Sequence, residues 1–215
     1  MNKVFLYLYP IQEYFKMFLF TDDKYYEEWN VPRPLPILND LITKRYREQG
    51  YQVVIAIYPD KEIFGITPHP EDKILHTDVL FTEASGYRSD GSEKPLEEVK
   101  YPSEEHLISS LGEVDELRVG GFHFSDCVKR VAEHAINKGI NTLVDLDLTD
   151  LFFNVYRREG YLNYKEYIPE DFKEMMIKRY SSSPEEEEYE RRLIEKNYAS
   201  PVYGMNKEEA INKTM

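Results

Sequence analysis

The chain has 215 residues, of which 41% are hydrophobic and 31% charged, so it can form a sizeable hydrophobic core and does not have a disordered composition. Its net charge of −13 repels phosphate backbones and anionic lipid headgroups, which disfavours binding to nucleic acid or to a membrane surface. One cysteine excludes an internal disulfide and a cysteine-rich zinc site, and it suits a reducing compartment.

The first half of the chain contains two buried strands and one helix. The apolar run "KVFLYLY" predicts a strand over residues 3–9, which Pro10 stops. Leu38, Leu41, Ile42 and Tyr46 recur at helical spacing over residues 36–49, and Gly50 supplies the helix end. "QVVIAIY" predicts a second strand at 52–58. Turn-forming residues dominate from 60 to 100, which predicts a long excursion with one short strand, "DVLF", at 78–81.

The second half alternates helices and strands. Ser103 stands at a helix N-cap ahead of "EEHLISSL". Strands are predicted at 117–122 ("LRVGGF") and 141–148 ("NTLVDLDL"), with a helix over 128–138 between them and another helix over 150–160. This alternation predicts a three-layer α/β/α fold with a mostly parallel central sheet over residues 1–162. Residues 163–215 are acidic, and Ser183 and Pro184 open a helix there, so we expect a helical C-terminal extension.

Cys127, in "GGFHFSDCV", follows a predicted strand and begins a predicted helix. The positive end of a helix dipole lowers the pKa of a thiol, and the first-turn N–H groups can bind an oxyanion. The alternative interpretation is that Cys127 is a small buried hydrophobic residue, which is the commoner role of a lone cysteine.

The segment "RVGGFHFSDCVKRVAEHAINKG" resembles the isochorismatase-like cysteine hydrolases, whose motif is a strand, then Gly-Val-Ala-Thr-Asp-x-Cys-Val, then an alanine-rich helix that ends at glycine. The resemblance implies that Cys127 is the nucleophile and that Phe122 and His123 shape the oxyanion hole. It also implies that Lys100, about 25 residues upstream, is the electrostatic partner. Lys94 is the competing candidate for that position.

The same resemblance places the catalytic aspartate of the family at Pro10 in "LYPIQEYF", where Gln12 and Phe15 fall on the motif glutamine and phenylalanine. Gln12 is therefore a candidate pocket residue. Proline can neither accept a proton nor pair with a lysine, and losing a positioned base typically costs about 10²–10⁴ in rate. Asp60, after the second strand, Glu13, and the loop residues Asp22 and Asp23 are the carboxylates that could replace it, although each fits a solvated surface acid better.

Two other sites deserve comparison. Asp60, His69 and His76 occupy the region where nicotinamidase-like members bind a metal, but their spacing matches no known ligand pattern, so we expect no metal and no cofactor. "LVDLDLTD" matches the nucleophile motif of haloacid-dehalogenase-like phosphatases, with Asp145 and Asp147 as the paired acids. In that family the motif strand normally opens the fold, whereas only 66 residues follow Thr149 here.

The sequence therefore predicts an isochorismatase-like protein with lost or altered hydrolase activity, which binds a ligand or assembles with other copies. The alternative is an active cysteine hydrolase that forms a Cys127 thioester with a small amide or carbamoyl substrate. A small-molecule ligand and a homo-oligomer are the expected partners, without nucleic acid or membrane. Since no stretch approaches the about 20 apolar residues of a membrane span, we expect a cytoplasmic protein.

Overall fold

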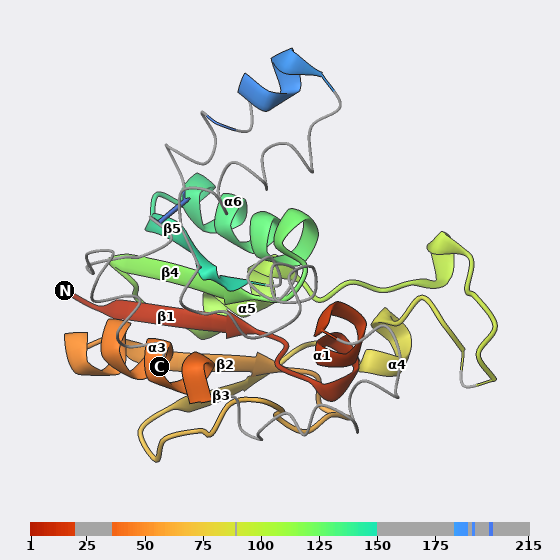
Figure 1. Ribbon diagram of the computed structural model, residues 1–215, viewed down its shortest axis with the longest axis horizontal. Coiled ribbons are helices and arrows are strands. Elements are labelled where there is room, and N and C mark those ends of the chain that lie inside the picture. The colour runs from red at the N-terminus through yellow and green to blue at the C-terminus, as the bar shows by residue number, and fades with distance from the viewer. Residues whose placement is uncertain (20–35, 89, 150–182, 189–190, 192–197, 200–215) are drawn as a thin grey trace.

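The computed structural model describes residues 1–19, 36–88, 90–149, 183–188, 191 and 198–199 (Figure 1). The described strands form one all-parallel sheet in the order β3-β2-β1-β4-β5-β6. The strands are β1 (Lys3–Leu8), β2 (Gln52–Ile57), β3 (Lys73–His76), β4 (Glu116–Gly121), β5 (Asn141–Thr149) and β6 (Tyr198–Ala199). This sheet confirms the predicted α/β fold class.

The helices cover both faces of the sheet. They are α1 (Gln12–Leu19), α3 (Pro36–Arg45), α4 (Phe81–Ala84), α5 (Glu104–Ser110) and α6 (Lys129–Asn137), with shorter turns at Arg47–Gln49, Leu96–Glu98 and Phe124–Val128. The β1-to-β2 and β4-to-β5 connections move outward in opposite directions, and right-handed crossovers then put α3 and α6 on opposite faces. In Figure 1, α5 and α6 lie together on one side and α3 on the other. The architecture is therefore a three-layer α/β/α fold.

Aromatic and aliphatic side chains fill both interfaces. On the α3 side, the ring of Tyr46 stacks on Phe5 of β1 with centroids 3.8 Å apart, and both residues are fully buried. On the other side, α6 buries Val131, Ala132 and Ala135. These three residues belong to the apolar stripe that the helical periodicity predicts.

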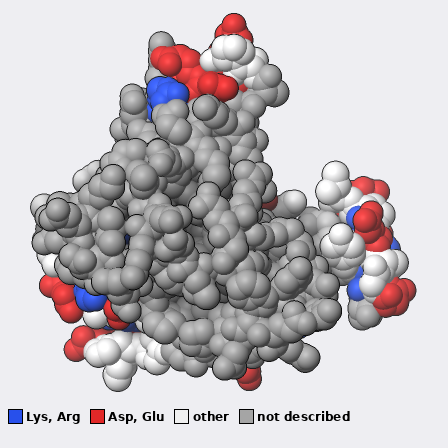
Figure 2. Space-filling view, viewed as in Figure 1, with Lys and Arg blue, Asp and Glu red and all other residues white. Residues whose placement is uncertain are grey.

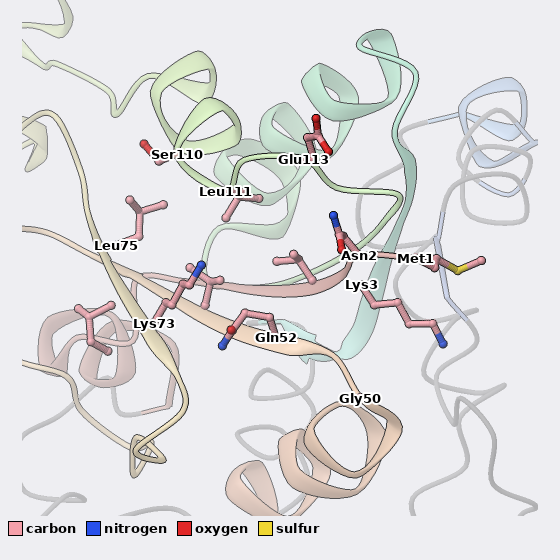
Figure 3. A pocket seen from close by; sticks show the side chains of 13 residues that line it. Met1, Asn2, Lys3, Gly50, Gln52, Lys73, Leu75, Ser110, Leu111 and Glu113 are labelled. Atoms are coloured by element: carbon pink, nitrogen blue, oxygen red, sulfur yellow. The ribbon is translucent and has the colours of Figure 1, made fainter.

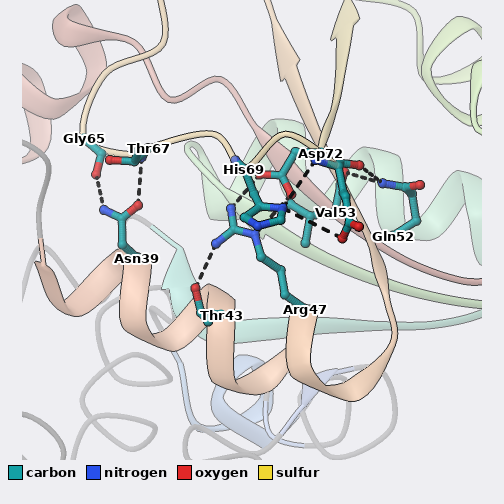
Figure 4. Close-up of polar contacts among 10 residues, drawn as sticks. Asn39, Thr43, Arg47, Gln52, Val53, Gly65, Thr67, His69 and Asp72 are labelled. Atoms are coloured by element: carbon teal, nitrogen blue, oxygen red, sulfur yellow. Dashed lines mark hydrogen bonds and ion pairs between the residues drawn. The ribbon is translucent and has the colours of Figure 1, made fainter.

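The β2–β3 connection is tied to α3 and the turn after it by side-chain hydrogen bonds (Figure 4). Arg47 Nε and Nη2 donate to Asp72 at 3.1 and 2.6 Å. Asn39 donates to the Gly65 carbonyl at 3.0 Å and accepts from the Thr67 N–H at 2.7 Å. This connection is consequently fixed against the body of the protein.

Most predicted elements occur within a few residues of their expected ends. Ser103 caps α5 by accepting a hydrogen bond from the His106 N–H at 3.2 Å, and Gly50 ends the turn after α3 with a φ of 76°. The predicted strand at 78–81 is wrong. The edge strand is β3, just upstream, and Phe81 begins α4 instead, where Asp60 accepts hydrogen bonds from the Phe81 and Thr82 N–H groups.

The predicted extension at 163–215 is described only in part, and the predicted helix at 150–160 lies outside the described residues. Ser183 accepts a hydrogen bond from the Glu186 N–H at 3.2 Å, and residues 184–188 are helical, as the Ser-Pro pair predicts. Residues Tyr198 and Ala199 form β6, which pairs with Val144 and Asp145 of β5. The sheet therefore includes a strand from the extension, which the sequence analysis missed.

An excursion between α4 and α5 projects away from the body of the molecule (Figure 1). It folds back on itself through an antiparallel bridge between Tyr87 and Glu93. Figure 2 shows that its surface mixes both signs of charge, whereas acidic side chains gather over the helix at 184–188. None of the helices in the described residues combines the length and apolar character needed to cross a membrane.

Candidate functional site

The candidate site lies at the carboxyl ends of β1 and β4, where the strand order reverses. Ligands of open parallel α/β sheets bind in the crevice at this switch point. Among the described residues, Tyr9 and His123 are the non-glycine residues with positive φ, at 57° and 62°. They follow β1 and β4 directly, and each costs about 1–3 kcal/mol of backbone strain. Strain concentrated at a switch point marks it as a functional candidate.

Gly121 explains why the two strands can approach so closely at this point. A Cβ atom on Gly121 would lie 2.3 Å from the Leu8 carbonyl oxygen, and the φ of Gly121 is 117°. Only glycine fits both constraints. The glycine that the motif predicts is therefore required by the backbone, whatever chemistry the site performs.

Three tyrosines fill the switch-point crevice. Tyr9 follows β1, Tyr14 lies on α1 and Tyr58 follows β2, and they are 1%, 7% and 1% exposed. The Tyr14 and Tyr58 hydroxyl groups are 3.0 Å apart and share a buried hydrogen bond. The ring of Tyr14 meets the His123 imidazole edge-on, with centroids 4.6 Å apart. Side chains of this chain thus occupy the space in which this fold class usually binds a ligand.

Burial determines the protonation states in this cluster. Desolvation raises the pKa values of Tyr9, Tyr14 and Tyr58 well above their ordinary value, and an ionised Cys127 would raise all three further. The three phenols therefore stay protonated at physiological pH and cannot accept a proton from a thiol. Desolvation lowers the pKa of His123, against the opposing effect of Asp126, which favours the neutral imidazole.

Cys127 lies in a π-helical turn, Phe124–Val128, that leads into α6. The turn is held by the His123 carbonyl, which accepts hydrogen bonds from the Asp126 and Val128 N–H groups at 3.0 and 3.1 Å. Cys127 is 8% exposed and belongs to the hydrophobic core. The thiol has the position that the motif predicts, but it is largely shielded from solvent.

The carboxylates whose charges affect these tyrosines are all paired with cations. Glu104 and Asp126 both contact Arg130, the latter at 3.6 Å, and Glu13 pairs with Lys61 at 2.5 Å. Each of these carboxylates raises the pKa of Tyr9 or Tyr14. Each of these three carboxylates thus already has a cationic partner in the structure.

Lys100 stands on the excursion, and the structure pairs it with a different partner from the one that the motif implies. Its ammonium group donates to Glu83 at 2.6 Å, and its side chain is 65% exposed. Lys94, the competing candidate, donates to the Thr82 carbonyl. Both lysines are thus bound to α4 residues, while Cys127 is buried in the core.

The remaining predicted site residues are dispersed. Gln12 is exposed at the start of α1, and Asp60 is exposed and bonded to the start of α4. Partial burial acts to raise the pKa of Asp60, but the hydrogen bonds that its carboxylate accepts from backbone N–H groups lower that pKa overall. Phe122 is fully buried, and its N–H donates to the Leu8 carbonyl at 3.1 Å. The structure therefore places Phe122, His123 and Cys127 in the switch-point region, with Gln12 and Asp60 on the surface.

The other two acid and histidine patterns also have structural partners. His69 Nδ1 lies 3.8 Å from Glu71, and the His76 carbonyl contacts His106, so Asp60, His69 and His76 have separate contacts. Within the described ranges, no three histidine, cysteine or acidic side chains form a group that could hold a metal. Asp145 is fully buried and accepts two hydrogen bonds from Arg45, at 2.9 and 3.0 Å, and one from the Tyr46 hydroxyl at 2.5 Å. Its carboxylate thus joins β5 to α3.

Sequence reasoning missed the tyrosines, which are the main residues of this region. Tyr9, Tyr14 and Tyr58 follow strands or open a helix, where an aromatic residue has no distinguishing local pattern. The usable signal was their number, because 18 tyrosines in 215 residues is high. The number of tyrosines does not indicate which of them lie close together in the fold.

Comparisons with known proteins assign this chain to no family. No protein-family model matches it, and no curated protein matches it. Among solved structures, the MAR1 ribonuclease from Caenorhabditis elegans is similar at 14% identity, over 96% of this chain and 98% of that chain, with a TM-score of 0.37. A likeness at that TM-score supports no conclusion about activity, so the function has to be argued from the site itself.

Proposed function

We propose that this protein is a divergent isochorismatase-like protein that works by binding and does not hydrolyse amides through Cys127. The observation that supports this proposal most directly is the filled switch-point crevice. Tyr9, Tyr14 and Tyr58 occupy it, and Cys127 is 8% exposed beneath the surface. Because Cys127 and these tyrosines are all buried, a substrate carbonyl would reach the sulfur atom only after side chains move.

The proton chemistry also favours binding over hydrolysis. A cysteine hydrolase needs a base that takes the thiol proton and returns it to the leaving group. Pro10 stands at the position implied for that base, the neighbouring phenols are held protonated, and Glu104 and Asp126 are paired with Arg130. Within the described residues, Cys127 therefore stands at the position of the nucleophile, but no carboxylate stands out as its base.

The partner that we propose is a second copy of this chain, which would meet the excursion. Four large hydrophobic side chains in and beside the excursion are exposed: Leu80 at 41%, Tyr87 at 54%, Leu96 at 81% and Tyr101 at 46%. Because the excursion projects from the body, another molecule could bury them.

Light scattering should report a dimer or higher oligomer, and Leu96→Ser should shift the equilibrium toward the monomer. A wild-type monomer at micromolar concentration would contradict this assignment.

Alkylation of the single cysteine tests the hydrolase question. Iodoacetamide labelling of Cys127, followed by intact mass spectrometry, should be slow in the folded protein at every pH from 6 to 9. The same protein in urea should react at the ordinary rate of a free thiol. A panel of small amides and carbamoyl compounds should give neither turnover nor a thioester adduct. Rapid labelling of the folded protein near pH 6, together with an acyl adduct, would refute the proposal.

One observation favours the second candidate, an active cysteine hydrolase. His123 lies four residues before Cys127, and burial lowers its pKa, so a neutral imidazole is available as a base. In that case His123→Asn should abolish turnover of a substrate that the wild type hydrolyses. Asn is the matched replacement because it tolerates the positive φ at this position.

A further inference from the structure

The short helix α4 covers the outer side of the tyrosine cluster at the switch point. The ring of Phe81 meets the rings of Tyr58 and Tyr14 edge-on, with centroids 5.4 and 5.7 Å apart. An ionised Cys127 would raise the pKa values of both tyrosines, so the thiol belongs to the same cluster. In Figure 1, α4 lies beside α1, at the end of the sheet to which the arrows of β1 and β2 point.

The contacts that hold α4 on the cluster are weak ones. None of its four residues is fully buried, and Phe81 and Ala84 pack against the core as half-buried side chains. Asp60 accepts hydrogen bonds from the Phe81 and Thr82 N–H groups at 2.7 and 3.3 Å, and the Lys61 ammonium group lies 4.4 Å from the centroid of the Phe81 ring. Few buried apolar contacts and exposed polar ones are typical of segments that open locally.

The chain is fixed to the body of the protein on both sides of this segment. Thr77 is buried, and its N–H donates to the carbonyl of the last residue of β2 at 3.0 Å. Asp78 accepts a hydrogen bond from the Ser103 N–H at 3.0 Å, and Glu104 pairs with Arg130 of α6. The segment between these two fixed points can therefore move without breaking the pairing of the sheet.

The excursion is attached to α4 and not to the sheet. The Lys100 ammonium group donates to the Glu83 carboxylate at 2.6 Å, and the Lys100 N–H donates to the Glu83 carbonyl at 3.2 Å. Lys94 donates to the Thr82 carbonyl. Two lysines thus join α4 to the excursion, so the two parts form one unit.

The amino-terminal edge of the sheet shows the contrast. A pocket of about 430 Å³ opens there between the ends of β1, β2, β3 and α5, among the exposed side chains of Lys73 and Glu113 (Figure 3). Those two charges are of opposite sign, so they favour neither an anion nor a cation. At the carboxyl edge, buried aromatic rings lie beneath α4 instead. A molecule that enters at the carboxyl edge therefore requires a segment to move.

We propose that α4 is a lid that controls access to the switch-point crevice and to Cys127, with Asp60 as its latch. In this structure the lid is closed. When α4 swings away together with the excursion, the Phe81 ring leaves Tyr14 and Tyr58 and uncovers their outer side. The inference goes beyond the proposed function, because the lid governs entry whether the crevice binds a ligand or Cys127 reacts.

The urea dependence of Cys127 labelling tests how the thiol is reached. Opening a short lid exposes far less surface than global unfolding, and the urea dependence of an opening scales with the surface that it exposes. The slow iodoacetamide labelling of the folded protein should therefore be almost independent of urea well below the unfolding transition. A labelling rate that rises with the full urea dependence of global unfolding from the first addition of urea would overturn the lid.

Latch variants identify α4 as the segment that opens. Asp60→Ala should raise the labelling rate of Cys127 about tenfold, because two hydrogen bonds to a charged group are lost. Phe81→Ala, which removes the covering ring, should raise it at least as much. Asp40→Ala removes a likewise exposed carboxylate from α3, where it pairs with Lys44, and should leave the rate unchanged.

Urea midpoints separate the lid from general destabilisation. The midpoint of global unfolding should be nearly the same in Asp60→Ala and Asp40→Ala, although only the first variant labels faster. An unchanged labelling rate in Asp60→Ala, or an equal rise in Asp40→Ala, would overturn the proposal. Amide turnover or an acyl adduct would refute the proposed function and leave these rate comparisons intact, so the two failures are distinguishable.

Discussion

The two edges of the same parallel sheet differ in how their space is used. At the carboxyl edge, Tyr9, Tyr14 and Tyr58 are buried at the switch point, and Cys127 is 8% exposed. At the amino edge, the ends of β1, β2 and β3 leave a pocket of about 430 Å³ with Lys73 facing it. Fold topology predicts a ligand at the first edge, but the described side chains leave room at the second. Topology alone therefore does not show whether the space at a strand end is open.

The two edges of the sheet differ because different segments border the strand ends there. At the carboxyl edge, Tyr9 and His123 adopt a strained backbone that directs large side chains inward. Burial of aromatic surface offsets that strain, since each ring buries about 150–250 Å². At the amino edge, β3 is a short edge strand whose residues are exposed or half-buried.

The largest effect should come from opening the carboxyl edge. Phe122 is fully buried and packs against Phe15, with ring centroids 4.6 Å apart. Phe122→Ala should lower the free energy of unfolding by about 3–5 kcal/mol, because it leaves a cavity in a packed core. Urea denaturation measures this loss. Alkylation of Cys127 in the folded variant should also become faster, and an unchanged rate would show that the thiol is shielded by other residues.

The hydroxyl pair in the crevice should give the next largest effect. Tyr14→Phe or Tyr58→Phe alone leaves one buried hydroxyl without its partner, which should cost about 1–3 kcal/mol. The double variant should cost less than the sum of the two single variants, since it leaves no orphaned hydroxyl. A double-mutant cycle in urea measures the coupling. Additive losses would mean that the hydroxyls do not depend on each other.

A smaller, pH-dependent effect should come from His123. Burial lowers its pKa below the ordinary value of 6.5, with Asp126 opposing this shift. The unfolded chain therefore binds the proton more readily, so this contribution to stability is complete above pH 6.5 and is lost as pH falls below it. Urea midpoints at pH 7.5, 6.5 and 5.5 should fall toward acid. His123→Asn, which tolerates the positive φ, should flatten that slope, and an identical slope would contradict the assignment.

The smallest effects should come from the amino edge. Ile74 is 42% exposed on β3, so Ile74→Ala should lower the free energy of unfolding by less than about 1 kcal/mol. Lys73→Gln should change it by no more than about 0.5 kcal/mol, because the ammonium group makes no ion pair with the described residues. Urea denaturation beside Phe122→Ala provides the comparison. A large loss in either variant would show that the pocket wall is part of the core.

Local patterns predicted most of the fold, because each depends on neighbours in the sequence. The run that ends at Pro10 is β1, Ser103 caps α5, and Gly50 ends the turn after α3. β3 was missed because "KILH" is an exposed edge strand with only two apolar residues, a pattern too short to distinguish from a loop. The strand that was predicted at 78–81 is instead a turn that leads into α4.

The site was harder to predict, because its contacts join distant parts of the chain. Cys127 and Gly121 have the local positions that their motif indicates, and this much follows from sequence. The Tyr14–Tyr58 hydrogen bond spans 44 residues, and the Arg45–Asp145 pair spans 100. Positive φ values at Tyr9 and His123 carry no sequence signal, because non-glycine residues adopt them only under tertiary constraint.

The short strand β6 sets a practical limit on how this protein can be shortened. Tyr198 and Ala199 pair with Val144 and Asp145, so they cover part of the outer edge of β5. A recombinant fragment that stops before residue 198 would expose those backbone groups on a nine-residue, β-prone strand. Exposed edges of this kind template intermolecular pairing. Recombinant versions of the protein should therefore retain residues 198–199, and fragments without them are expected to aggregate at concentrations where the full chain stays dispersed.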